Sequence, residues 1–191
     1  MPSTMTSPPK PTNIHRPDPR FSQEVIKRSG VNLNLCWSCR TCSGGCPFYH
    51  AMDYGPNRLI RLIQLGLWRE ALESRTIWLC VGCNTCAIQC PNAIDVAALN
   101  DTLRAMALER GVVIAEPDVL AFHRSVLESI QSHGRTHKLE VMLRYKLHKG
   151  NFLDDVGVGL KMLAKGKLDI LPTRIEAVDH IRRIFRQRKA A

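Results

Sequence analysis

Two runs of cysteine with identical spacing constrain this chain more than any other feature of its sequence. The first run, closed by Pro47, consists of Cys36, Cys39, Cys42 and Cys46. The second run, closed by Pro91, consists of Cys80, Cys83, Cys86 and Cys90. Each member of the first run recurs 44 residues later, and the two runs contain all 8 Cys of the 191 residues. The repeat indicates duplication of a functional loop and is too short for a solenoid.

Eight thiols can form disulfides, bind metal or act as nucleophiles. The first residues lack the apolar stretch of a secretory signal, so we expect a cytoplasmic protein whose thiols stay reduced. A reduced cluster of thiols more often binds metal. Because two matched quartets leave no cysteine over, we expect no nucleophilic cysteine and no catalytic residue in this chain.

Each run reads C-x-x-C-x-x-C-x-x-x-C-P, which is typical of bacterial ferredoxins that bind [4Fe–4S] clusters. Three Cys separated by two residues can curl around three corners of a cubane, with loop amides directed at its sulfides. In ferredoxins with two clusters, the fourth Cys ligates the other cluster. On that rule, the ligands of the first cluster are Cys36, Cys39, Cys42 and Cys90. The ligands of the second cluster are Cys80, Cys83, Cys86 and Cys46.

A pair of zinc sites is the alternative to two clusters. Zinc sites commonly use C-x-x-C pairs separated by a longer arm, whereas each run here places four thiolates within eleven residues. The Cys-Pro ending has no evident role in zinc binding. The spacing therefore favours iron–sulfur clusters over zinc.

Several residues beside the runs are candidates for a supporting role. Trp37, Phe48, Tyr49 and Trp78 flank the ligands, where shielding of the clusters and ordinary core packing are both open interpretations. Glycines that we expect to allow close backbone approach or a positive φ are Gly44, Gly45 and Gly82. His50 lies near the first run, but with every thiolate assigned we expect a surface or supporting residue, not a ligand.

Outside the runs the sequence pattern is helical. Dense prolines predict a flexible arm over residues 1–20. Helical patterns are predicted at 21–29, 56–65, 67–72, 94–109, 116–132, 138–148, 153–164 and 174–188. We expect a mostly α protein with an α-helical ferredoxin domain at 21–111 and a helical extension at 112–191 that docks to another subunit.

The formal net charge of +10 raises the question of an acidic partner. Two clusters with their thiolates carry roughly 2− each, which reduces this excess to about +6. The dense basic run at 182–189 is typical of a solvated helix face, with a docking patch as the alternative. Nucleic-acid binding is not favoured, because no recognition motif or stacking platform accompanies the charge. The longest apolar run, Ile77 to Val81, is far shorter than the roughly 20 residues of a membrane span.

The segment from Leu35 to Val96 resembles the C subunit of heterodisulfide reductase. Besides the cysteine runs, the resemblance rests on P-N-R-L-I-R-L-I-Q-L-G at 56–66, on T-I-W-L at 76–79 and on Asp95-Val96. It implies an α-helical ferredoxin fold with two [4Fe–4S] clusters. It also implies electron relay from an A-type subunit with flavin and clusters to a B-type subunit whose CCG motifs handle a disulfide.

CCG motifs are absent from this chain, so the resemblance implies a non-catalytic electron-transfer subunit of a soluble oxidoreductase complex. Two other functions use the same ligands. One is the iron–sulfur subunit of another dehydrogenase complex, of the glycerol-3-phosphate or succinate type. The other, less favoured, is a cluster-bearing sensor that binds nucleic acid.

Overall fold

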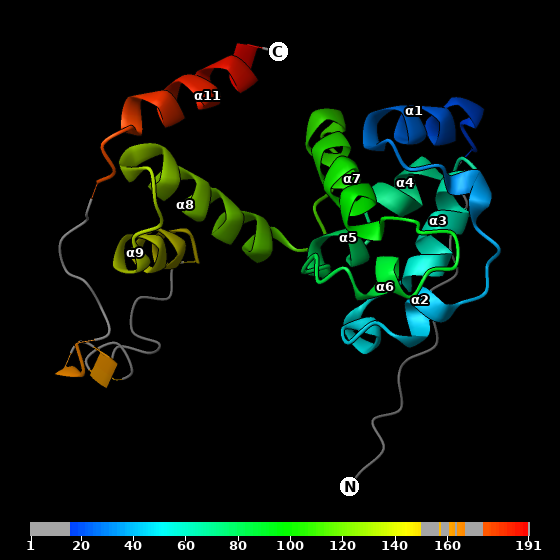
Figure 1. Ribbon diagram of the computed structural model, residues 1–191, viewed down its shortest axis with the longest axis horizontal. Coiled ribbons are helices and arrows are strands. Elements are labelled where there is room, and N and C mark those ends of the chain that lie inside the picture. Colours follow the sequence, from blue (N-terminus) through cyan, green and yellow to red (C-terminus); the bar gives the residue numbers. More distant parts are fainter. Residues whose placement is uncertain (1–15, 150–156, 158–160, 163, 167–173, 191) are drawn as a thin grey trace, which may run out of the picture. The chain divides into compact units, whose positions relative to one another are not determined.

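The structure is a computed structural model that describes residues 16–149, 157, 161–162, 164–166 and 174–190. The predicted arm over 1–20 and the predicted helix over 153–164 lie mostly outside these residues. Within them, every regular element is a helix (Figure 1), which confirms the mostly α fold class. The chain divides after Glu116 into two compact units, and each unit is described by itself.

The first unit combines helices of nine or more residues with helical turns of three to five residues. Its described elements are α1 (Pro19–Ser29), η1 (Leu33–Leu35), α2 (Thr41–Gly44), η2 (Tyr49–Ala51), α3 (Pro56–Gln64), α4 (Trp68–Leu72), α5 (Thr76–Leu79), α6 (Thr85–Ile88) and α7 (Val96–Arg110). The second unit contains α8 (Pro117–His133), α9 (Lys138–Lys149) and α11 (Val178–Ala190).

Helix α1 begins two residues earlier than the sequence pattern predicts. The Asp18 side chain accepts a hydrogen bond from the Arg20 amide, and Pro19 occupies the first turn, where its missing N–H is not needed. The helix ends at Gly30, which adopts the left-handed conformation with φ 71°. Phe21 and Val25 are fully buried, so the predicted apolar edge of this helix faces the core.

The core of the first unit lies between α1, α3, α4, α5 and α7. Helix α7 starts at the Asp95 cap and supplies Leu99, Leu103 and Met106, all fully buried. Helix α3 starts with a proline in its first turn, as predicted, and supplies the buried Leu59 and Ile63. In Figure 1 the short helices α2 and α6 lie side by side at the end of this unit away from α1. The long helices therefore form a scaffold for the two cysteine runs, which contain α2 and α6.

The second unit is built on an antiparallel pair, α8 and α9, with α11 packed on α8. Ser129 of α8 accepts a hydrogen bond from the His137 amide and donates one to Glu140 of α9. Helix α11 begins at Val178, four residues later than predicted. The Ile175 amide instead donates to the His133 carbonyl, and the Ile175 side chain lies against Gly134. None of the helices in the described residues has the length and apolar character needed to cross a bilayer.

We expect Gly66→Ala to destabilise the first unit more than Gly111→Ala. Both glycines have positive φ, 73° and 61°, so each substitution costs about 1–2 kcal/mol in backbone strain. At Gly66 a Cβ would also lie 2.4 Å from the Asp18 carbonyl oxygen, whereas nothing lies within 4 Å of one at Gly111. Relief of that backbone contact adds about 1–3 kcal/mol. Thermal unfolding followed by circular dichroism under anaerobic conditions measures both losses, and equal losses would contradict this packing.

Candidate metal centre

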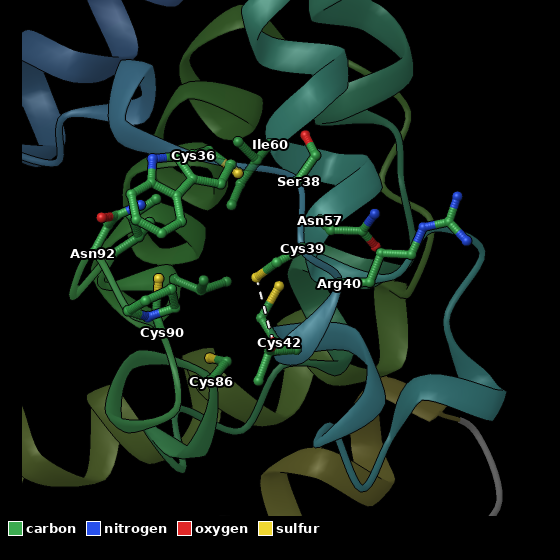
Figure 2. Close-up of a pocket in the computed structure, with 15 residues that line it drawn as sticks. Cys36, Ser38, Cys39, Arg40, Cys42, Asn57, Ile60, Cys86, Cys90 and Asn92 are labelled. Atoms are coloured by element: carbon green, nitrogen blue, oxygen red, sulfur yellow. Dashed lines mark hydrogen bonds between the residues drawn. The ribbon is translucent and has the colours of Figure 1, made fainter.

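The first cysteine run faces a small cavity. Its lining includes Cys36, Cys39, Cys42 and Cys90, the four residues predicted to share a cluster. Figure 2 shows the sulfurs of these residues placed around a common centre, with the sulfur of Cys86 on one side of it. The structure therefore brings the last cysteine of the second run to the first three cysteines of the first run.

The second cysteine run faces a separate small cavity. This cavity is lined by Cys46, Cys80, Cys83 and Cys86, again the predicted set. Cys86 lines both cavities, so the two spaces share a wall at helix α6.

Both runs use the same backbone conformation to direct three thiols inward. Left-handed φ values occur at Ser38 (56°) and Arg40 (65°) in the first run. They recur 44 residues later, at Gly82 (65°) and Asn84 (58°). Alternation of left- and right-handed residues makes successive amides converge on one side of the chain, a geometry that favours a negatively charged group. The repeat in sequence is thus also a repeat in conformation.

Three hydrogen bonds fix the first run against other parts of the unit. Asn92, two residues after Cys90, donates through its side-chain amide to the Leu35 carbonyl, just before Cys36, at 2.5 Å. This contact ties the end of the second run to the start of the first. Ser43 of α2 donates to the Asn57 side chain and accepts from the Asn57 amide, which fixes the first run on the N-terminus of α3.

The second run is held from helix α7. The Arg104 guanidinium donates to the carbonyls of Ile77, at 2.5 Å, and of Cys80. On the other side, the Asp53 carboxylate accepts hydrogen bonds from the Arg75 and Thr76 amides at the start of α5. Because α5 leads directly into Cys80, these contacts set where the second run begins.

The thiols differ in acidity in the same way in both runs. A hydrogen bond with the Thr41 hydroxyl, 3.3 Å away, lowers the pKa of Cys39, and the Thr85 hydroxyl at 3.5 Å lowers the pKa of Cys83. Burial raises the pKa of the third cysteine of the first run, Cys42. Burial, with the nearby Cys80 and Cys42 thiols adding to it, raises the pKa of Cys86 to about 11. The inner thiols are therefore protonated until a cation replaces the proton.

The other predicted supporting residues divide between the cavities and the core. Trp37 lines the first cavity and Phe48 the second, whereas Trp78 is a core residue, only 3% exposed. Tyr49 and His50 are exposed and line a third cavity beside these two.

The glycine prediction is correct only in part. Gly82 has the expected positive φ, but Gly44 and Gly45 do not. Gly44 is the last residue of α2, and Gly45 follows it with φ −89°. Gly45 makes room for the Gln89 side chain, since a Cβ there would lie 2.0 Å from Gln89 Oε1.

Several supporting residues were missed by the sequence reasoning. Thr41 and Thr85 could have been found, because C-x-T-C occurs at the same place in both runs. Asn92 and Arg104 carry no such signal, because their partners Leu35 and Cys80 lie 57 and 24 residues away in sequence.

The donor set and the loop conformation fit a polynuclear iron–sulfur group. Each cavity is lined by thiols from loops whose amides converge, as a negatively charged cluster with thiolate ligands requires. A zinc site needs its ligands about 2.3 Å from a single point. In the described part of the chain, no three Cys, His, Asp or Glu side chains are arranged to hold one metal ion.

Comparison with known proteins agrees with this fit. Residues 32–94 match the 4Fe-4S dicluster domain family. The chain is 30% identical over 94 residues to the iron-sulfur C subunit of the CoB–CoM heterodisulfide reductase of Methanopyrus kandleri, covering 49% of this chain and 47% of that protein. It is also 30% identical over 94 residues to the C subunit of the H(2):CoB-CoM heterodisulfide,ferredoxin reductase of Methanothermobacter marburgensis. That alignment covers 49% of this chain and 51% of that protein. The similarity thus spans about half the length of these relatives.

A further relative aligns over a longer part of its own length. The chain is 29% identical over 117 residues to the C subunit of the ferredoxin:CoB-CoM heterodisulfide reductase of Methanosarcina mazei, covering 61% of this chain and 68% of that protein. The helical fold, the two cysteine-lined cavities and the family match identify a 4Fe-4S dicluster domain for two [4Fe–4S] clusters. The relatives that it matches are C subunits of heterodisulfide reductases.

We expect Arg104→Met to weaken the second cysteine run selectively. The substitution leaves the Ile77 and Cys80 carbonyls without their donor, at a cost of about 1–3 kcal/mol. About half of the protein's iron is then expected to pass to a chelator faster than the rest. The matched control is Asp101→Ala, which removes only the exposed partner of Arg104 on the same helix. Uniform release of iron, or equal effects of the two variants, would contradict the assigned role.

We expect Thr41→Val to raise the pKa of Cys39 in the metal-free protein, because the hydroxyl that stabilises the thiolate is lost. Between the wild-type and variant pKa values, the variant has less thiolate and reacts more slowly with iodoacetamide; well above both values the rates converge. Mass spectrometry of the Cys39 peptide measures the rate against pH. Cys83, whose Thr85 is intact, is the internal control, and an equal change at Cys83 would contradict a local effect.

Proposed function

We propose that this chain is the electron-transfer subunit of a heterodisulfide reductase-type complex. The thiols of Cys36, Cys39, Cys42 and Cys90 bind one [4Fe–4S] cluster. The thiols of Cys46, Cys80, Cys83 and Cys86 bind the other. Such clusters accept and donate one electron each. The observation that carries the proposal is that two cavities, each lined by cysteines drawn from both runs, adjoin at Cys86.

The adjoining cavities support a relay function. Cys42 lines the first cavity and is close enough to Cys86 to affect its pKa, while Cys86 also lines the second cavity. Ligand sulfurs of the two sites are therefore neighbours. A purely structural role would need only one metal centre. A path for electrons needs two centres that lie close together.

The proposed partners follow from the relatives and from what this chain lacks. The matched relatives are named as subunits of heterodisulfide reductases. Every cysteine here lines one of the two cavities, so disulfide chemistry requires another polypeptide. We propose a CCG-motif B-type subunit for that chemistry and an A-type subunit with flavin and clusters as the other partner. We place the complex in the cytoplasm, where thiols stay reduced before clusters are loaded.

Paired cysteine variants test the crosswise ligation. If Cys46 belongs with the second run, Cys46→Ala with Cys83→Ala damages one site and leaves about four irons per chain. Cys46→Ala with Cys39→Ala then damages both sites and leaves fewer than four. Iron analysis after anaerobic reconstitution, with electron paramagnetic resonance of the reduced protein, distinguishes the two. If the variant with Cys46→Ala and Cys83→Ala instead retains less iron than the variant with Cys46→Ala and Cys39→Ala, each run ligates its own cluster.

An anaerobic pull-down with the full chain as bait tests the complex. We expect recovery of a CCG-motif protein and of a flavoprotein, and electron transfer between them that depends on this chain. Recovery of a glycerol-3-phosphate or succinate dehydrogenase subunit, or of nucleic acid that is lost as salt rises, would contradict the proposed complex while leaving the clusters in place.

A further inference from the structure

A third cavity, of about 490 Å³, lies beside the two cysteine cavities. We call it the basic cavity, and its lining includes Arg40, Ser43, Tyr49, His50, Asn57 and Arg58. Arg40 and Asn57 also line the first cysteine cavity, and Cys46 lines both the basic cavity and the second one. The volume is in the range of cavities that bind small molecules.

The charges around the basic cavity are of one sign. Two arginines and one histidine line it, and no carboxylate does among the residues that the structure describes. Within that part of the chain, neither Arg40 nor Arg58 forms an ion pair, whereas Arg75 pairs with Glu116 and Arg28 with Glu109. Guanidinium groups form their strongest hydrogen bonds with carboxylates and phosphates, often two at a time. Among the described residues, none supplies such an acceptor here.

The wall of the basic cavity is preorganised. The side chains of Ser43 and Asn57 bind each other, which fixes α2 on the first turn of α3. The Tyr49 ring packs on Gly55, where a Cβ would lie 2.6 Å from the ring. Figure 2 shows the Arg40 side chain extending away from the cysteine sulfurs. The cationic groups therefore project from a rigid wall, and binding an anion requires little ordering of the backbone.

We propose that the basic cavity binds an oxyanion, either a carboxylate or a phosphate group. Arg40 and Arg58 donate to its oxygens, and His50 and the Tyr49 hydroxyl complete the polar lining. The group belongs either to a free small molecule or to an acidic side chain presented by another protein. This site is independent of which redox complex contains the chain.

Titration calorimetry on the full, cluster-loaded chain tests the proposal, with inorganic pyrophosphate and citrate as probes. Arg58→Gln is expected to weaken binding about tenfold or more, because a charge-assisted hydrogen bond is lost. The matched control is Arg61→Gln on the same helix, one turn later, which makes the same change of charge outside the cavity. We expect this control to change affinity less than about threefold. Iron content and circular dichroism check that each variant is folded.

A second arm distinguishes the two sources of the oxyanion with a glutamate-rich peptide as probe. Binding of pyrophosphate or citrate that depends on Arg58 supports a free anion. Binding of the peptide alone, again dependent on Arg58, supports an acidic side chain. The proposal is wrong if no probe binds more tightly than about 1 mM, or if Arg58→Gln and Arg61→Gln have equal effects.

Discussion

The structure depends on one constraint, which is that the last cysteine of each run must reach the cavity of the other run. Two loops that are 44 residues apart in sequence must then lie face to face. The helices between and after the loops hold them in this arrangement. The Asn92–Leu35 hydrogen bond holds the loops together directly. Arg104 holds the second loop from α7. The core residues of α3 and α7 thus serve mainly to hold in place the side chains that make these contacts.

This constraint has an energetic cost that metal binding offsets. Ser38, Arg40 and Asn84 adopt left-handed backbone conformations, which cost of order 1–3 kcal/mol each for residues other than glycine. Burial also holds Cys42 and Cys86 in their protonated form. Cluster ligands must be deprotonated, so loading releases protons and its free energy becomes part of the folding free energy.

The sequence was sufficient for the architecture but not for the contacts that hold it. The thiols that the cysteine spacing groups together line the same cavities, with Cys86 lining both, and their assignment as cluster ligands stays a prediction. A proline at the start of α3 and glycines at the ends of α1 and α7 marked helix boundaries correctly. These features are local, so one stretch of chain contains the whole signal. Arg104 was missed because its partners are carbonyls, which every residue has. Gly45 was misinterpreted because its reason, the Gln89 side chain, comes from a distant part of the chain.

The two runs are not equivalent, and the difference bears on the basic cavity. At its two left-handed positions the second run has glycine and asparagine, Gly82 and Asn84, the residue types that tolerate this conformation best. The first run has Ser38 and Arg40 there, which tolerate it less well. An arginine is therefore held in a strained conformation at a position that lines both the first cysteine cavity and the basic cavity. The second run makes the same loop with asparagine at the matching position, so the loop itself does not require an arginine there, and the choice of residue is consistent with the anion site proposed for the basic cavity.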